Sequence, residues 1–581
     1  MVSGDSTCLY NHGHFVGLLH HIEATGIHNP HDFYDGRFCT VVLSQTNLAY
    51  SNYFGGVDRG CLFHFQIGSY CSHGLWPLLF VGEDMFFQVL SETFHPMVFL
   101  YMVVGVASGI CIGALPGLTA TMGVALLLPM TFGMEATEGI LMLLGIYVGA
   151  IYGGSITAVL LHTPGTPASA ATAIDGYRFS QRGEAGRALG LTTLGSYIGG
   201  VVSVICLWLI SPQLAKLALN FSSAEFFLLA LFGLCIISNV SGSNQEKGLI
   251  CGCLGVLVAT VGIDGVTGYI RFSKNINVLS GINYIPIMIG LFAMSQAFEG
   301  IETIFNKEKI DAKIDRVLPK KSDMKHLFRI APVTGLIGTF IGIIPGAGAD
   351  IGSFVGYNVA RGMSKNKDQF GKGSPEAIIG PEGGNNGVTG GAMIPMLTLG
   401  VPGDAVTAIM IGALTIQGLT PGPMLFQEHK VLVYSIFLGM FVANTIMMIM
   451  GLSCIKLFTK VLKIPVGILT PLIFVLCVVG SYSMANNIFD VYVMMVSGIV
   501  GYFLSKLKVP TSPAILGLIL GPMAEANFRT ALLKTSGDVS VFFATPLCWF
   551  FIALIFFSIF GGSIGKLILR IVKKGRAEGP S

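Results

Sequence analysis

The strongest constraint on the fold is a pair of glycine- and proline-rich stretches that interrupt long apolar runs in the same order twice. The first stretch is GALPGLTATMG at 113–123, and the apolar segment after it ends in HTPGTPAS at 162–169. The second is GIIPGAGADIG at 342–352, and its companion segment ends in TLGVPGD at 398–404. Proline removes a backbone donor and glycine adds chain entropy, so both residues break helices. The repeated order predicts an internal duplication.

Composition places these breaks in a lipid bilayer. Hydrophobic residues make up 52% of the chain and charged residues only 11%, where ordinary globular chains carry roughly a quarter charged residues. The mean hydropathy is +0.72. The formal charge of +3 gives no reason to expect a nucleic-acid partner. We therefore predict an all-α polytopic membrane protein with about 10–12 transmembrane helices.

Interrupted helices have a specific meaning at membrane depth. Non-helical backbone is tolerated there only where protein buries it or where it lines a polar cavity. Matching interruptions in the two halves of a transporter indicate its binding site. We therefore expect broken or hairpin helices, with 119–132 and 139–161 as the first examples.

The placement of basic residues predicts that the two repeats have inverted topology. Lys and Arg stay on the cytoplasmic side of short loops. The loop at 131–139 carries two Glu and no basic residue, whereas its counterpart at 361–373 carries one Arg and three Lys. After the second element of each repeat the asymmetry reverses, with Arg178, Arg182 and Arg187 in the first half against Lys430 in the second. Inverted repeats related by an axis in the membrane plane show this pattern.

The sequence divides into a first transmembrane half at 85–304, a basic cytoplasmic loop at 305–328, a second transmembrane half at 329–576 and a tail at 577–581. Residues 1–84 differ from the rest, because they hold eight of the twelve His and no apolar segment of spanning length. We interpret them as an atypical N-terminal extension from a misplaced start, with Met85 as the expected first residue. A metal-binding extension is the alternative.

The stretches at 113–177 and 370–426 resemble the TctA family, the large membrane subunit of bacterial tripartite tricarboxylate transporters. The resemblance runs from about Met85 to the basic tail. It implies a multi-pass permease of the bacterial inner membrane that works with a small TctB-like membrane subunit and a periplasmic TctC-like solute-binding protein. It also implies uptake of citrate or related carboxylates, driven by an ion gradient. The motifs do not specify which carboxylate is carried.

The chemistry of the breaks agrees with an anionic substrate, because half-helix N-termini expose unpaired N–H groups and a partial positive charge. Carbonyl and amide oxygens at the same breaks suit a hard cation, so we expect Na⁺ rather than H⁺ as coupling ion, with no other cofactor and no bound metal. The alternative is that the glycines only permit close helix packing. The predicted substrate-binding residues are Pro116, Gly117, Thr163, Pro164, Gly165, Thr166, Pro345, Gly346, Gly348, Asn385, Asn386, Pro402 and Gly403, and the predicted coupling-ion residues are Asn385, Asn386 and Asp404.

Several other polar residues have two interpretations. Asp350 and Glu382 lie beside the breaks, where an acid either takes part in ion coupling or caps a helix. Asp175 is expected in a cytoplasmic turn, and His162 is expected to pack through a hydrogen bond.

The sequence predicts a transporter rather than an enzyme. The string GGSIG at 561–565 lacks the strand–turn–helix setting of a nucleophile elbow. A stand-alone ion-coupled organic-anion transporter and a channel stay as alternatives.

Overall fold

The computed structural model describes residues 83–115, 117–240, 245–265, 267–303, 317–461 and 466–559, which belong to the unit of the chain that begins at Val81. Five sequence predictions lie wholly or largely outside the described residues. They concern the N-terminal extension, Pro116, the basic loop up to residue 316, the GGSIG string and the C-terminal tail.

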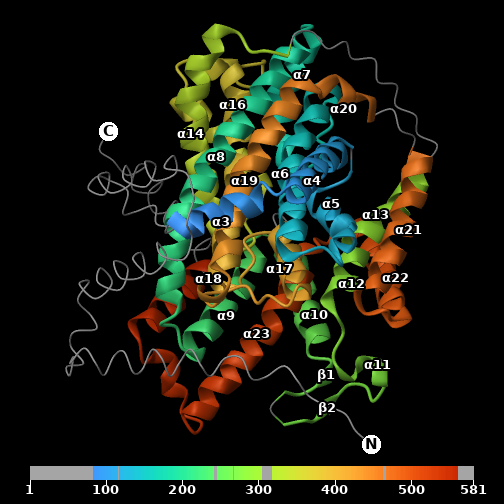
Figure 1. Ribbon diagram of the computed structural model, residues 1–581, viewed down its shortest axis with the longest axis vertical. Coiled ribbons are helices and arrows are strands. Elements are labelled where there is room, and N and C mark those ends of the chain that lie inside the picture. Colours follow the sequence, from blue (N-terminus) through green and yellow to red (C-terminus); the bar gives the residue numbers. More distant parts are fainter. Residues whose placement is uncertain are drawn as a thin grey trace, which may run out of the picture. The chain divides into compact units, whose positions relative to one another are not determined.

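The first half of the described chain is almost entirely helical (Figure 1). Its elements are α3 (Glu83–Thr93), α4 (Pro96–Ala114), α5 (Ala120–Leu127), η4 (Leu128–Thr131), α6 (Ala136–Leu161), η5 (Pro167–Ser169), α7 (Ala170–Gln181), α8 (Ala185–Ala218), α9 (Ser223–Val240), α10 (Gln245–Ala259), α11 (Ile276–Leu279), α12 (Tyr284–Met288), the π-helical η6 (Ile289–Met294) and α13 (Ser295–Thr303). A short antiparallel pair, β1 (Gly262–Ile263) and β2 (Ile270–Arg271), joins α10 to α11.

The second half continues with helices. Its elements are α14 (Lys321–Ile343), α15 (Ala349–Met363), η7 (Lys367–Gln369), α16 (Pro375–Leu399), α17 (Ala405–Ile416), α18 (Leu425–Glu428), α19 (Lys430–Ser453), α20 (Ile455–Val461), α21 (Val466–Ala485), α22 (Ile488–Lys506), α23 (Ser512–Lys534), η8 (Val539–Phe543) and a last helix at Pro546–Ile559.

Length and composition confirm the prediction of an all-α polytopic membrane protein. Among the described helices, eight are long and apolar enough to cross a membrane, and four shorter apolar helices accompany them. The most apolar part of α6 is 100% buried by other helices, whereas that of α22 is only 22% buried. Helix α6 is therefore central, and α22 leaves most of its apolar surface free for lipid.

The predicted interruptions fall at the glycine–proline motifs, but not inside 139–161. That segment was expected to be a broken or hairpin helix, and instead it lies within the continuous helix α6. The helix ends at Leu161, and the next residue, His162, adopts a left-handed conformation with φ of 59°. Proline is absent from α6 and its glycines serve packing, so the main break occurs only at the His162–Pro164 segment.

Helix α4 packs tightly against α6, and α14 packs tightly against α16, through stripes of glycine. A Cβ atom at Gly109 of α4 would lie 2.9 Å from the Cα atom of Ile146, and one at Gly342 of α14 would lie 2.6 Å from the carbonyl oxygen of Val388. Real Cβ atoms do not approach backbone this closely, so both helix pairs depend on residues without side chains. Small residues at regular spacing are the usual way for membrane helices to come into close contact.

The same order of elements recurs in both halves. A long helix, a glycine–proline break, a short helix and a buried long helix appear first as α4 to α6 and again as α14 to α16. Helices α6 and α16 run in opposite directions: Tyr147, early in α6, bonds Asp404 beyond the end of α16, whereas Ser155, later in α6, bonds Glu382 near its start. Inverted topology stays a prediction, which this antiparallel pair supports.

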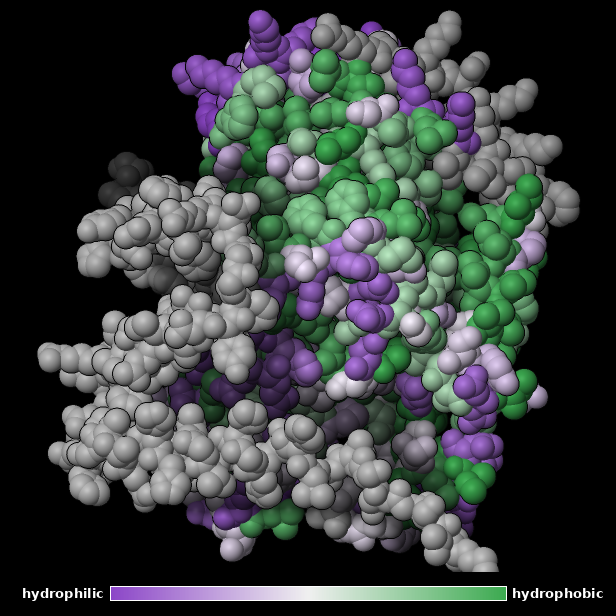
Figure 2. All heavy atoms as spheres, in the orientation of Figure 1, coloured by the Kyte–Doolittle hydropathy of each residue, from purple (hydrophilic) through white to green (hydrophobic). Residues whose placement is uncertain are grey.

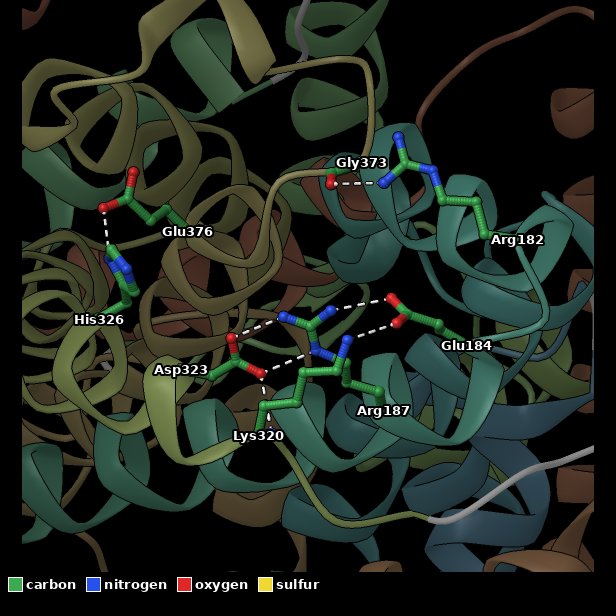
Figure 3. A network of polar contacts seen from close by, with 8 residues as sticks. All are labelled: Arg182, Glu184, Arg187, Lys320, Asp323, His326, Gly373 and Glu376. Carbon is green, nitrogen blue, oxygen red and sulfur yellow. Dashed lines mark hydrogen bonds and ion pairs between the residues drawn. The ribbon is translucent and has the colours of Figure 1, made fainter.

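Charged residues gather where α7 and α8 meet α14 and α16 (Figure 3). Arg187 of α8 donates two hydrogen bonds to the carboxylate of Asp323, from Nε to Oδ2 at 2.8 Å and from Nη2 to Oδ1 at 2.7 Å. Its Nη1 atom donates to Glu184 Oε2 at 2.8 Å, and the Nζ atom of Lys320 donates to Glu184 Oε1 at 2.7 Å. The hydrogen bond from the Lys320 ammonium lowers the pKa of the Glu184 carboxyl. Figure 2 shows hydrophilic residues at this end of the molecule and mainly hydrophobic surface beside them.

Asp175 also belongs to this junction, and the prediction that it lies in a turn is wrong. It is buried within α7. Its carboxylate accepts hydrogen bonds from the backbone N–H groups of Gly371 (2.9 Å), Gly373 (2.7 Å) and Ser374 (3.0 Å) and from the hydroxyl of Tyr357 (3.0 Å). The side chain therefore holds the segment that leads into α16.

Candidate functional site

A cavity of about 420 Å³ lies where the first turns of several helices meet. Five of its wall segments are helix starts: 119–121 before and in α5, 166–168 at η5, 348–350 at α15, 404–406 at α17 and 511–513 at α23. Most of the remaining wall comes from the π-helical η6, from α13 and from α22, including Phe292 and Gln296, and α6 contributes Ile151. Among the described residues that line it there is no Lys, Arg or His.

The helix starts give this cavity its electrostatic character. The first turn of a helix leaves backbone N–H groups without intrahelical partners, and the helix dipole adds a partial positive charge there. At the N-terminus of α15 the cap residue is Gly348, which has no side chain to occupy those donors. Thr166 caps η5 without a side-chain bond to it. Two other starts do have side-chain caps, since Thr119 accepts from the N–H of Met122 in α5 and Asp404 accepts from the N–H of Thr407 in α17. Helix ends without such caps are a favourable setting for an anion even where no basic side chain is present.

The structure brings only some of the predicted substrate-binding residues to the cavity. Thr166, Gly346 and Gly348 line it, and so does Asp404, which was predicted as a coupling-ion residue. Gly117 lies next to it, since a Cβ atom at that position would be 3.8 Å from Oε1 of the cavity residue Gln296. The predicted residues that do not line it are Thr163, Pro164, Gly165, Pro345, Asn385, Asn386, Pro402 and Gly403.

Gly165 and Gly403 lie behind the cavity wall and pack against backbone. A Cβ atom at Gly165 would collide with the carbonyl oxygen of Gly113 and lie 2.6 Å from Thr157 Oγ1, and one at Gly403 would lie 2.6 Å from the carbonyl oxygen of Gly342. For these two residues the packing alternative describes their surroundings better than ligand contact.

Gly346 connects the two breaks of the second half. Its N–H group donates to the carbonyl oxygen of Gly403 at 2.7 Å, and its φ of 81° is one that residues with a side chain rarely adopt. Gly117 holds the corresponding position in the first half with a φ of 88°. At these positions glycine is required by the backbone conformation of the turn.

Asp404 places a carboxylate in the wall of the cavity. Its Oδ1 atom accepts from the N–H and the hydroxyl of Thr407, each at 2.8 Å, and thereby caps α17. Its Oδ2 atom accepts from the buried hydroxyl of Tyr147 at 2.5 Å. Asp350, in the first turn of α15, is exposed and also lines the cavity. Asp350 and Asp404 therefore both contribute a carboxyl group to the wall of the cavity.

Asn385 and Asn386 lie inside α16 rather than in the cavity, and both are fully buried. The Nδ2 atom of Asn385 donates to the carbonyl oxygen of Ala168 at 3.2 Å, and Ala168 lines the cavity. The Nδ2 atom of Asn386 donates to Asn385 Oδ1 at 2.7 Å. Glu382, one turn earlier in α16, is surrounded by hydroxyl groups. These polar residues form a layer directly behind the cavity wall.

His162 has a packing environment. Its Nδ1 atom lies 3.1 Å from the carbonyl oxygen of Ala173, and its ring centroid lies 4.9 Å from that of Tyr177.

Sequence reasoning missed the cavity residues that lie outside the two repeated motifs. Thr511 and Ser512 come from the start of α23, and Gln296 comes from α13. The string PTSP at 510–513 is itself a helix-start signal, with hydroxyl residues followed by proline at the first helical positions. Nothing in the sequence places that start beside the glycine–proline breaks.

Comparison with known proteins adds an independent line of evidence. A family model described as the tripartite tricarboxylate transporter TctA family matches residues 99–516. An uncharacterized 52.8 kDa protein in the TAR-I ttuC' 3' region of Agrobacterium vitis is 36% identical over 453 residues, which are 78% of this chain and 90% of that protein. An uncharacterized protein in the TAR-II ttuC' 3' region of the same organism is 40% identical over 210 residues, or 36% of this chain and 87% of that protein. No solved structure matches the chain.

Proposed function

Because the chain belongs to the tripartite tricarboxylate transporter TctA family, we propose that it is the permease subunit that imports citrate-like tricarboxylates or related carboxylates. The carboxylate binds in the cavity between the helix starts. The protein acts as a carrier and not as an enzyme. The family and the apolar helices make it a multi-pass membrane protein, and we place it in the bacterial inner membrane with the basic junction of α7, α8 and α14 in the cytoplasm.

The observation that carries the proposal is the convergence of five helix starts on one cavity. Each N-terminus of a regular helix carries roughly half an elementary charge. Several of them together offset a substrate with two or three negative charges, while the backbone N–H groups supply directional donors. A cavity without Lys or Arg also releases its anion more readily than one with a fixed ion pair, which suits a carrier that must bind and release.

We propose that Na⁺, rather than H⁺, enters with the substrate. Asp350 and Asp404 contribute negative charge on the cavity wall, and a hard cation that prefers oxygen ligands balances both these acids and the substrate carboxylates. Backbone carbonyl groups freed at the breaks add further oxygen donors.

The family also supplies the proposed partners. A small TctB-like membrane subunit and a periplasmic TctC-like solute-binding protein complete the transporter, and the binding protein delivers the carboxylate to the outward-facing cavity. A stand-alone carrier needs neither subunit.

Uptake of labelled citrate and other carboxylates into proteoliposomes tests these points together. The chain is reconstituted with and without the two partners, under imposed Na⁺ or H⁺ gradients. We expect saturable uptake that requires both partners and follows the Na⁺ gradient. Full uptake without partners would identify a stand-alone carrier, and current that does not saturate with substrate would identify a channel.

A matched pair of glycine variants in α15 tests the location of the site. Gly348→Val adds two methyl groups and a Cβ atom whose near neighbour is the flexible Asp350 side chain. Gly362→Val, at the other end of α15, meets open space. Overfilling the cavity by about 1–3 kcal/mol corresponds to a loss of roughly 5- to 150-fold in apparent affinity for Gly348→Val. Uptake by Gly362→Val should be unchanged. Equal uptake by the two variants would exclude the cavity as the substrate site.

A further inference from the structure

Glu382 is a carboxyl group held inside the helix bundle by neutral hydroxyl groups. It is fully buried in α16. Its Oε1 atom accepts from Ser155 Oγ of α6 at 2.5 Å and from Thr172 Oγ1 of α7 at 2.5 Å. Its Oε2 atom accepts from Ser196 Oγ of α8 at 2.7 Å. We call Ser155, Thr172 and Ser196 the hydroxyl cage.

The cage supplies hydrogen bonds to Glu382 but no compensating charge. In the part of the chain that the structure describes, every ion pair involves other acids, and none reaches Glu382. An ionised carboxylate in a low-dielectric interior is costly unless a positive charge accompanies it. An ionised Glu382 would therefore need one additional positive charge beside it, which no described side chain supplies in an ion pair.

Among the described residues, no titratable group of the neighbouring helices forms an ion pair with Glu382. On α6, the hydroxyl of Tyr152 lies 2.9 Å from Thr193 Oγ1, and Tyr147 bonds Asp404. On α7, Asp175 accepts from the backbone of the 371–374 segment.

The described basic groups of α7, α8 and α14 either pair with other acids or are exposed, and the exposed ones are Arg178, Lys216, Lys321 and Lys325. Arg187 binds Glu184 and Asp323. His326 and Arg329 bind Glu376 at the first turn of α16.

Two further oxygen atoms near Glu382 point to a ligand. Thr166 Oγ1 and Asn386 Oδ1 are buried and have no hydrogen-bond partner among the described residues. Thr166 packs against α6 at Gly154, the residue before the cage residue Ser155, since a Cβ atom on Gly154 would be 2.9 Å from the Thr166 backbone nitrogen. Asn386 lies one turn beyond Glu382 on the same face of α16. Buried polar atoms in native proteins nearly always have a partner.

We propose that Glu382, with the hydroxyl cage, forms a binding site for one monovalent cation, Na⁺ or H⁺. Carboxylate, hydroxyl and amide oxygens are the donors that a hard cation takes, and a proton on the carboxyl supplies the same single charge. As a coupling site, this assignment rests on the proposed transport function. The connection to the substrate runs through Asn385, which lies on the same face of α16 and donates to the cavity residue Ala168.

The site is tested on the purified full chain in lipid nanodiscs without carboxylate, so the result does not depend on transport. Bound ²²Na⁺ is counted, and the infrared C=O band of a protonated carboxylic acid is recorded in Na⁺-free buffer. We expect about one bound Na⁺ or one acid band, and its loss in Glu382→Gln. A wild-type chain with neither signal, or a Glu382→Gln chain that keeps the wild-type signals, would overturn the proposal.

Milder variants keep the test informative if Glu382→Gln does not fold. Thr172→Val retains volume and removes one cage hydroxyl. Na⁺ affinity should then fall roughly tenfold, or the acid band should persist to higher pH because the charged carboxylate has lost a donor. Thr172→Ser restores the hydroxyl and the wild-type behaviour. Glu376 is another acid of α16 and pairs with Arg329 of α14. Glu376→Gln should leave both signals unchanged. If Thr172→Val and Thr172→Ser had the same Na⁺ affinity and the same acid band, the Thr172 hydroxyl would have no part in the site.

Reconstituted uptake separates the failure of this inference from that of the proposed function. If Glu382 binds a cation and no carboxylate is transported, the site holds and the transport proposal fails. If transport proceeds and Glu382→Gln responds to Na⁺ and H⁺ gradients like the wild type, Glu382 is not the coupling site.

Discussion

Replacing Arg187 with Met should destabilise the protein more than any other single change in the charged junction of Figure 3. The Asp323 side chain is only 3% exposed and that of Arg187 15% exposed, and two charge-assisted bonds join them. Removing the guanidinium leaves a buried carboxylate whose remaining bond is to the backbone N–H of Lys320 at 3.0 Å. Breaking one side of a buried pair costs about 3–5 kcal/mol. The Arg187 side chain retains some solvent access, so we expect the lower end, about 3 kcal/mol.

The same junction contains its own control. The Lys320 side chain is 59% exposed and pairs with Glu184, which is 32% exposed. Solvent screens such a pair, so Lys320→Met should cost no more than about 1 kcal/mol. Asp323→Asn should cost less than Arg187→Met, because Arg187 keeps its bond to Glu184. The double variant Arg187→Met with Asp323→Asn should lower the free energy of unfolding by about 1–3 kcal/mol less than the sum of the two single changes.

The free energy of unfolding is measured by titrating purified protein from mild detergent into SDS, with the four variants and the wild type in parallel. Uptake is recorded as well, since the pair joins α8 to α14 and so holds the two halves together. Equal losses of unfolding free energy in Lys320→Met and Arg187→Met would contradict the expectation that the buried pair contributes more than the exposed one. Additive losses in the double variant would show that Arg187 and Asp323 are not energetically coupled.

Three further predictions concern topology, packing and the start of the chain. Single cysteines at Glu135 and Lys365 should react with a membrane-impermeant thiol reagent from outside and from inside respectively, and labelling from the same side would remove the inverted repeat. Gly342→Val should prevent correct folding, since its Cβ would lie 2.6 Å from a carbonyl oxygen of α16, whereas Gly362→Val should fold normally by size-exclusion chromatography. A chain that begins at Met85 should insert and take up carboxylate like the full chain, and failure to insert would show that the extension is needed.

The sequence predicts where the helices break, because proline and glycine act locally through missing donors and permitted backbone angles. It does not predict which side of a break faces the ligand. Gly346 and Gly165 belong to the same type of motif, yet Gly346 lines the cavity and Gly165 packs against Thr157. The difference depends on how neighbouring helices pack around each break, and a local motif contains no information about those contacts.

Tertiary contacts also explain the errors on polar residues. Asp175 sits in a DGY string that suggests a turn, but its carboxylate is used by backbone N–H groups about 200 residues away along the chain. The hydroxyls around Glu382 come from the three consecutive helices α6, α7 and α8, which lie 186 to 227 residues before it in the sequence. Each of them alone resembles an ordinary serine or threonine in an apolar segment. The sequence identifies Glu382 as a candidate intramembrane acid, but the groups around it depend on how the helices pack together.

The hydrogen bond between the Gly346 N–H and the Gly403 carbonyl has a mechanical consequence. It acts as a crosslink between the turn before α15 and the turn before α17, and both turns end in helix starts that line the cavity. A movement that withdraws one of these helix starts while the other stays in place must break a 2.7 Å bond between backbone groups. The two starts are therefore expected to travel as one body, so the contacts they make to a bound anion are gained or lost in a single step.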